Sequence, residues 1–100
     1  MEASAEEVLQ FVGKIIRKID GKMGENPIGG KLLSKEEIKI KDFISIVNKI
    51  AHRYVYYLSE EEREKLKLNK ERLSQSFWKD LEPLEKEKKI KFYIFMGYIM

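Results

Sequence analysis

Apolar residues in the first part of the chain recur every three or four positions, the spacing that lines one face of an α-helix. Its predicted apolar face comprises Val8, Val12, Ile15 and Ile19. Ser4 followed by Glu7 has the Ser-x-x-Glu form of a capping box, in which each side chain accepts a hydrogen bond from the other residue's backbone N–H. The helix is therefore expected to begin near Ala5, and Gly21 suits its C-terminal cap.

The next stretch, residues 21–33, holds four of the six glycines and one of the two prolines. This composition predicts a flexible loop. The pair Gly30-Lys31 does not indicate a phosphate-binding loop, which needs Gly-x-x-x-x-Gly-Lys-Ser/Thr. Glu25 occupies the position of the first glycine and Leu32 follows the lysine, so we expect a linker.

Ser34 and Glu37 repeat the capping box and predict a second, longer helix that runs to Leu58. Residues spaced by three or four positions form its broad apolar face, which makes this the expected central helix. These residues are Ile40, Phe43, Val47, Ile50, Tyr54 and Leu58. Basic and aromatic residues gather on the opposite face, namely Lys35, Lys39, Lys49, Arg53 and Tyr57.

A third capping box, Ser59 with Glu62, predicts a new helix directly after the central one. Its first turn is acidic, which the helix dipole favours. The apolar stripe that follows is sparse and comprises Leu66, Leu73, Phe77 and Leu81. Pro83 suits the first position of a last helix, because its missing N–H would have no partner there.

The last nine residues, from Phe92 to Met100, carry no charge, and four of them are aromatic. The run is too short for a membrane span, which needs about twenty apolar residues. A β-strand suits the residue types, but it would need a second molecule to complete its hydrogen bonds. We favour a helix that is buried on more than one face, partly in the core and partly against a partner. The predicted interface residues are Phe92, Tyr93, Phe95, Met96, Tyr98 and Ile99.

Together these patterns predict an all-α protein, a compact bundle of four to five helices with a strongly apolar C-terminal helix. Residues 1–100 are expected to form a single helical domain, with the flexible loop at about 21–33. The charged share of 37% and the shortage of amide side chains resemble the composition of thermophile proteins. The acidic amino terminus lacks the features of a secretory signal, so a cytoplasmic protein is expected.

Residues that usually carry catalysis or bind metal ions are scarce. The chain has no cysteine, one histidine and three aspartates, which lie in separate segments. The serines have no neighbouring histidine or glycine-rich turn to activate them, and most glutamates sit in capping boxes or beside lysines. The sequence therefore predicts a protein that is not an enzyme, with no cofactor, no catalytic residue and no metal site.

Positive charge is concentrated in one part of the chain. From Lys14 to Lys41 there are eight Lys or Arg residues against four Asp or Glu, a local charge of +4 in a chain whose net charge is +3. Basic residues along one face suit contact with phosphates, and aromatic neighbours can stack on unpaired bases. A solvated helix surface without a ligand is the alternative interpretation. The candidate nucleic-acid-binding residues are Lys14, Arg17, Lys18, Lys35, Lys39, Lys49, Arg53 and Tyr57.

These features lead us to expect a small, non-catalytic accessory subunit of a larger nucleic-acid-processing complex, such as a DNA polymerase assembly or an RNA-guided effector. Its C-terminal helix would bind a larger protein subunit or a second copy of the chain. Its basic helix faces would contact the phosphates of DNA or RNA, and no membrane association is expected. The alternative is a helical protein–protein adaptor or homodimer with no nucleic-acid role.

Overall fold

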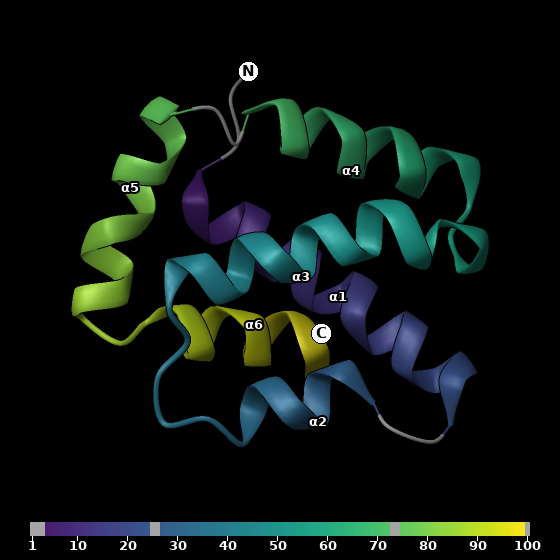
Figure 1. The fold of residues 1–100 in the computed structure, drawn as a ribbon, viewed down its shortest axis with the longest axis horizontal. Helices are drawn as coiled ribbons and strands as arrows, with labels where there is room; N and C mark the ends of the chain where they lie inside the picture. Colours follow the sequence, from purple (N-terminus) through teal and green to yellow (C-terminus); the bar gives the residue numbers. More distant parts are fainter. Residues whose placement is uncertain (1–3, 25–26, 73–74, 100) are drawn as a thin grey trace.

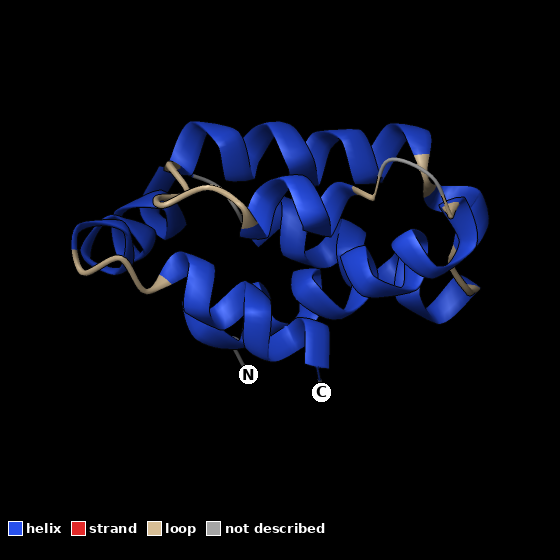
Figure 2. Ribbon diagram, turned by 90° about the horizontal axis from the view of Figure 1, so that it is seen from below, coloured by secondary structure: helices blue, strands red, loops and turns tan. Residues whose placement is uncertain are grey.

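The computed structural model describes residues 4–24, 27–72 and 75–99, without the side chains of 68–72 and 75–78. All regular structure in these ranges is helical (Figure 1; Figure 2). The elements are α1 (Ala5–Met23), α2 (Ile28–Leu33), α3 (Ile40–Arg53), the 3-10 turn η1 (Val55–Tyr57), α4 (Glu60–Arg72), α5 (Gln75–Lys86) and α6 (Ile90–Ile99). The predicted all-α bundle is confirmed, and α2 is a short helix in addition to the longer ones.

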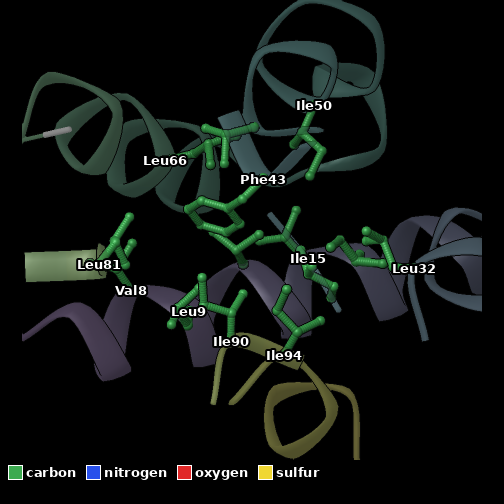
Figure 3. Close-up of a cluster of buried hydrophobic side chains, with 14 of the residues drawn as sticks. Val8, Leu9, Ile15, Leu32, Phe43, Ile50, Leu66, Leu81, Ile90 and Ile94 are labelled. Atoms are coloured by element: carbon green, nitrogen blue, oxygen red, sulfur yellow. The ribbon is translucent and has the colours of Figure 1, made fainter. Parts of the chain in front are cut away.

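The longer helices enclose a hydrophobic core between α1 and α3. In Figure 1, α3 runs across the middle of the molecule, with α4 above it, α6 and α2 below it and α5 at one end. Phe43 of α3 lies at the centre of the core, where side chains from α1, α4, α5 and α6 converge on it (Figure 3). Leu66 and Leu81 of the predicted sparse stripe are buried there, whereas Leu73 and Phe77 lie outside the described side chains.

Two glycines face each other where α1 and α6 cross. Gly13 and Gly97 are both buried. A Cβ added at Gly13 would overlap the backbone oxygen of Ile94 and would lie 3.0 Å from the Cα atom of Gly97. A Cβ added at Gly97 would overlap the backbone of Gln10. The two helices therefore pack backbone against backbone, and a side chain at either glycine would force them apart.

The side chain of Asp20 connects three helices. It is only 8% exposed, and its carboxylate accepts hydrogen bonds from the N–H groups of Ile28 (2.7 Å) and Gly29 (2.8 Å) at the start of α2. The hydroxyl of Tyr98 on α6 donates to the same carboxylate at 3.0 Å. Desolvation of the Tyr98 hydroxyl and this hydrogen bond raise the pKa of Tyr98. Asp20 thus supplies acceptors that the first turn of a helix lacks, and holds α2 against α1 and α6.

The prediction of a flexible loop over 21–33 is wrong for most of its length. α1 continues to Met23 with Gly21 inside it, and Gly24 ends the helix with a φ of 71°. Residues 28–33 form α2. Glycine disfavours an isolated helix by about 1 kcal/mol relative to alanine, which is why the composition indicated a loop. The hydrogen bonds of Asp20 to the start of α2 oppose this preference.

The helix predicted from Ser34 to Leu58 is shorter at both ends. Ser34 does not begin it, because its hydroxyl donates to the carbonyl oxygen of Lys31 at 2.8 Å. Residues 37–39 are not helical, and Ile38 among them is buried in the core. α3 then ends at Arg53, and η1 turns the chain so that Leu58 is also buried. Burial of these two apolar side chains outweighs the local preference for one long helix.

The serines of the other two predicted capping boxes, Ser4 and Ser59, do cap helices, at the starts of α1 and α4. The N–H of Glu7 donates to the hydroxyl oxygen of Ser4 at 3.2 Å. Ser59 and Glu62 exchange both hydrogen bonds, at 2.9 and 3.2 Å, and Glu62 also pairs with Lys18 of α1. Burial alone would raise the pKa of Glu62, but the hydrogen bonds from Lys18 and Ser59 outweigh burial and lower it. This carboxylate therefore both caps α4 and ties it to α1.

Pro83 lies inside α5 and does not begin a last helix. The chain turns a few residues later, where Lys88 has a φ of 60°. The N–H groups of Lys88 and Lys89 donate back to carbonyl oxygens in the last turn of α5, at 3.0 and 2.7 Å, which is the Schellman pattern. A turn at this position allows Leu84 before it and Ile90 after it both to be buried.

Candidate nucleic-acid interface

A cavity of about 320 Å³ lies between α2 and α3, beside the end of α1. We call it the α2–α3 cavity. Four basic side chains line it, those of Lys31, Lys35, Lys49 and Arg53. The other lining residues are apolar or aromatic, namely Met23, Ile28, Leu32, Ile46 and Tyr54. None of the described acidic residues lines it, so the cavity combines a cationic border with an apolar wall.

The secondary structure accounts for this gathering of cations. Lys49 and Arg53 lie four positions apart on α3 and therefore share one face of the helix. Arg53 is in the last turn of α3, where the helix dipole favours a positive charge. Lys31 is in the last turn of α2, and Lys35 follows that helix. The Asp20 hydrogen bonds that hold α2 in place thus also bring Lys31 and Lys35 towards α3.

Acidic side chains compensate these charges only in part. Lys35 Nζ lies 3.6 Å from Asp42 Oδ2, and both side chains are well exposed, so the attraction is screened by solvent. Within the described part of the chain, Lys31, Lys49 and Arg53 form no ion pair. Cations held near one another without carboxylates create a positive potential that attracts anions.

A shallower groove continues from the cavity along the outer face of α3. It shares Lys49 and Arg53 with the cavity. Its other polar lining residues are Lys41, Ser45, Asn48 and His52. The basic surface is therefore longer than the cavity and extends along α3 to Lys41 in its first turn.

Three of the eight predicted nucleic-acid-binding residues, Lys35, Lys49 and Arg53, line the α2–α3 cavity. Tyr57 lies just outside it, 37% exposed, and its ring stacks against that of Tyr54 with 6.4 Å between the ring centroids. Lys31 belongs to the basic stretch from Lys14 to Lys41 but is not among the eight candidate residues. Its place after Gly30 in a glycine-rich stretch was the available signal, but only the unforeseen helix α2 makes it part of a site.

The remaining predicted residues lie elsewhere. Lys14 and Arg17 are exposed on α1, and Lys18 of the same helix is paired with Glu62. Lys39 is exposed directly before α3. None of these four basic residues lines the α2–α3 cavity, so the structure places the predicted set on at least two separate surfaces.

The C-terminal helix α6 has two apolar faces. The inner face, Ile90, Ile94 and Gly97, is buried. The outer face carries three large exposed side chains, which we call the outer strip: Phe92 (55% exposed), Phe95 (43%) and Ile99 (55%). A shallow groove beside it is lined by Leu33, Phe92, Phe95, Lys88 and Lys91. Within the described ranges, no helix is both long enough and apolar enough to span a lipid bilayer.

The other three predicted interface residues, Tyr93, Met96 and Tyr98, are half-buried. The two tyrosines pack against the core. The hydroxyl of Tyr93 donates to Glu6 at 3.4 Å, and that of Tyr98 donates to Asp20. These side chains are therefore partly committed to the chain's own fold, and the outer strip is the part of α6 most accessible to a partner.

Among the described residues, no three His, Asp or Glu side chains lie close enough together to hold a metal ion. Comparisons with protein-family models, with curated proteins and with solved structures find no match to this chain. The function is therefore inferred from the geometry and charge of the chain itself.

Proposed function

We propose that this chain is a non-catalytic accessory subunit of a nucleic-acid-processing complex, and that it contacts the phosphates of DNA or RNA through the α2–α3 cavity and the adjoining face of α3. The observation that carries this proposal is the convergence of four cations on one cavity that none of the described acidic residues lines. A merely solvated helix surface usually mixes acidic and basic residues. Phosphate contacts instead need cations that lie side by side.

The outer strip of α6 is the proposed anchor to a larger protein subunit. Phe92, Phe95 and Ile99 recur at the three- and four-residue spacing of helix-in-groove recognition. Lys91 and Lys88 border the adjacent groove. Lys88 also forms an ion pair with Glu37, with 3.1 Å between Nζ and Oε1. A partner with acidic residues around an apolar centre would complement this charge.

The alternative is a helical adaptor or homodimer without a nucleic-acid role, and the outer strip supports it as well. Light scattering over a concentration series shows whether the outer strip binds a second copy of the chain or a different protein. A monomer at every concentration agrees with a different partner. A dimer that Phe95→Ser abolishes would instead identify a second copy of the chain as the occupant of the strip.

Fluorescence anisotropy with labelled DNA and RNA at several salt concentrations tests the nucleic-acid contact. The variant Lys49→Gln/Arg53→Gln removes two charges but keeps aliphatic stems over the cavity. We expect weaker binding, and a plot of log K against log salt whose slope is reduced by about 1.4–1.8, because each of the two lost phosphate contacts contributes about 0.7–0.9.

The matched control is Lys14→Gln/Arg17→Gln, which removes the same charge from exposed positions of α1. We expect it to change the affinity much less than the cavity variant does. Equal losses in the two variants would indicate general attraction to a basic protein. No binding by the wild-type chain would refute the proposed contact.

A further inference from the structure

We infer that the α2–α3 cavity receives the base of an unpaired nucleotide while the surrounding cations hold its phosphate and those of its neighbours. The surface would then bind single strands in preference to duplexes. This inference rests on the proposed nucleic-acid contact and goes beyond it by naming the form of nucleic acid and the group that enters the cavity.

The apolar wall is the first reason. A surface that meets only phosphates needs neither concavity nor apolar lining, yet Ile28, Leu32 and Ile46 are among the residues that line this cavity. Bases that are not stacked in a duplex bury their faces against such side chains. The volume of about 320 Å³ is near the lower end of ligand sites, which span about 300–1,000 Å³. The cavity therefore suits one nucleotide.

The aromatic pair at the cavity is the second reason. Tyr54 lines the cavity and stacks on Tyr57, with an angle of 25° between the two rings. Tyr57 continues the aromatic surface to the solvent, where a neighbouring base could stack. Arg53 precedes Tyr54 and also lines the cavity, and its guanidinium can bind a phosphate through two hydrogen bonds.

The number of cations is the third reason. Lys31, Lys35, Lys49 and Arg53 exceed what a single carboxylate on an apolar ligand would require. A strand offers several consecutive phosphates around one base, which matches four cations around one cavity. A duplex offers the phosphates too, but its bases are paired and stacked, so none of them can enter the cavity and contact its apolar wall. The difference between single-strand and duplex affinity therefore reports on the cavity.

The test uses a labelled short oligoadenylate and a hairpin duplex with the same number of phosphates. Ile46→Trp and, independently, Met23→Trp place a large side chain in the cavity without changing the charge. Both wild-type residues are half-buried, and far-UV circular dichroism shows whether each variant folds. We expect the wild-type chain to bind the single strand at least about tenfold more tightly than the duplex. We expect either folded variant to lose that preference and keep its duplex affinity.

A measurement on the wild-type chain does not depend on these variants. An oligoadenylate with one 2-aminopurine should change its fluorescence on binding, because the base leaves its neighbours for the cavity. Unchanged fluorescence in the bound state would overturn the inference.

The outcomes separate the two proposals. Equal affinity for strand and duplex, with no effect of the tryptophan variants, would overturn the inference and leave the phosphate contact in place. Failure to bind either probe would overturn both. Binding of ADP that Ile46→Trp abolishes, without binding of the strand, would assign the cavity to a free nucleotide and refute the strand contact.

Discussion

Gly13→Ala and Gly21→Ala are the same substitution in the same helix, yet the structure predicts opposite effects on stability. Gly21 is exposed, and a Cβ added there would meet no heavy atom within 4 Å. Alanine favours a helix interior over glycine by about 1 kcal/mol, so Gly21→Ala should raise the free energy of unfolding by about that amount. At Gly13 the same gain is opposed by overlap with the backbone of α6.

The size of the stability loss in Gly13→Ala follows from the atoms that must move. They belong to the backbone around Ile94, so no side-chain rotation relieves the overlap. α6 must instead shift away from α1, which loosens the packing of the fully buried Ile90 and Ile94. Overpacking of a core site costs about 1–3 kcal/mol, and a backbone obstacle places this site at the upper end. After the helix gain, we expect Gly13→Ala to lose about 2 kcal/mol, so the two variants should differ by about 3 kcal/mol.

Urea unfolding followed by far-UV circular dichroism measures both free energies. For a chain of this size, 1 kcal/mol corresponds to about 4–8 °C in Tm, so a thermal melt gives an independent estimate. Gly97→Ala should resemble Gly13→Ala, because its Cβ would overlap the backbone of Gln10. If Gly13→Ala stabilised the protein as much as Gly21→Ala, the close crossing of α1 and α6 would be refuted.

Three further predictions concern local interactions. Asp20→Ala removes the acceptor of two α2 N–H groups and of the Tyr98 hydroxyl, and should lower the free energy of unfolding by about 2–3 kcal/mol in urea; unchanged stability would contradict the cap. The raised pKa of Tyr98 means that its hydrogen bond contributes fully below the pKa of an unfolded tyrosine, about 10, and is lost as the pH rises through the higher folded pKa. The stability gap between wild type and Tyr98→Phe should therefore shrink only in alkali, and a constant gap would contradict this. Lys88→Gly should raise Tm by relieving about 1 kcal/mol of backbone strain at a φ of 60°. Lys88→Ala should not raise Tm, because alanine keeps the strain. An equal rise in both variants would contradict the strain.

Local signals explain what the sequence predicted well. Ser4 and Ser59 cap helices because each capping box involves residues three positions apart, and both helices begin one residue after the serine. The periodic residues of the first helix, from Val8 to Ile19, are all buried. A repeating pattern of this kind records which face of a helix meets the core.

Contacts between distant segments explain the errors. α2 depends on the carboxylate of Asp20, eight and nine positions before the amides that it caps. The start of α3 has an N–H donor at Ile40 that reaches Glu85, 45 positions away. The capping box at Ser34 was a valid local pattern, but burial of Ile38 in a non-helical segment prevailed. None of these partners can be inferred from helix periodicity.

In the candidate site, too, local patterns were predicted well and contacts between distant segments were not. Lys49 and Arg53 were predicted from the outward face of one helix, which periodicity defines. Lys18 was predicted as a phosphate contact, but Glu62, 44 positions later, pairs with it. Lys31 joined the site only because α2 folds against the rest of the chain. Sequence periodicity gave the direction of each side chain but not its neighbours on other helices.

The most direct test of the proposed function is an NMR titration of the ¹⁵N-labelled chain with a short single-stranded oligonucleotide. The largest amide shifts are expected at residues 28–35 and 46–57, which surround the α2–α3 cavity, with small shifts around the exposed Lys14 and Arg17 of α1. Shifts of equal size over both surfaces, or no shifts at all, would contradict a nucleic-acid contact at the cavity.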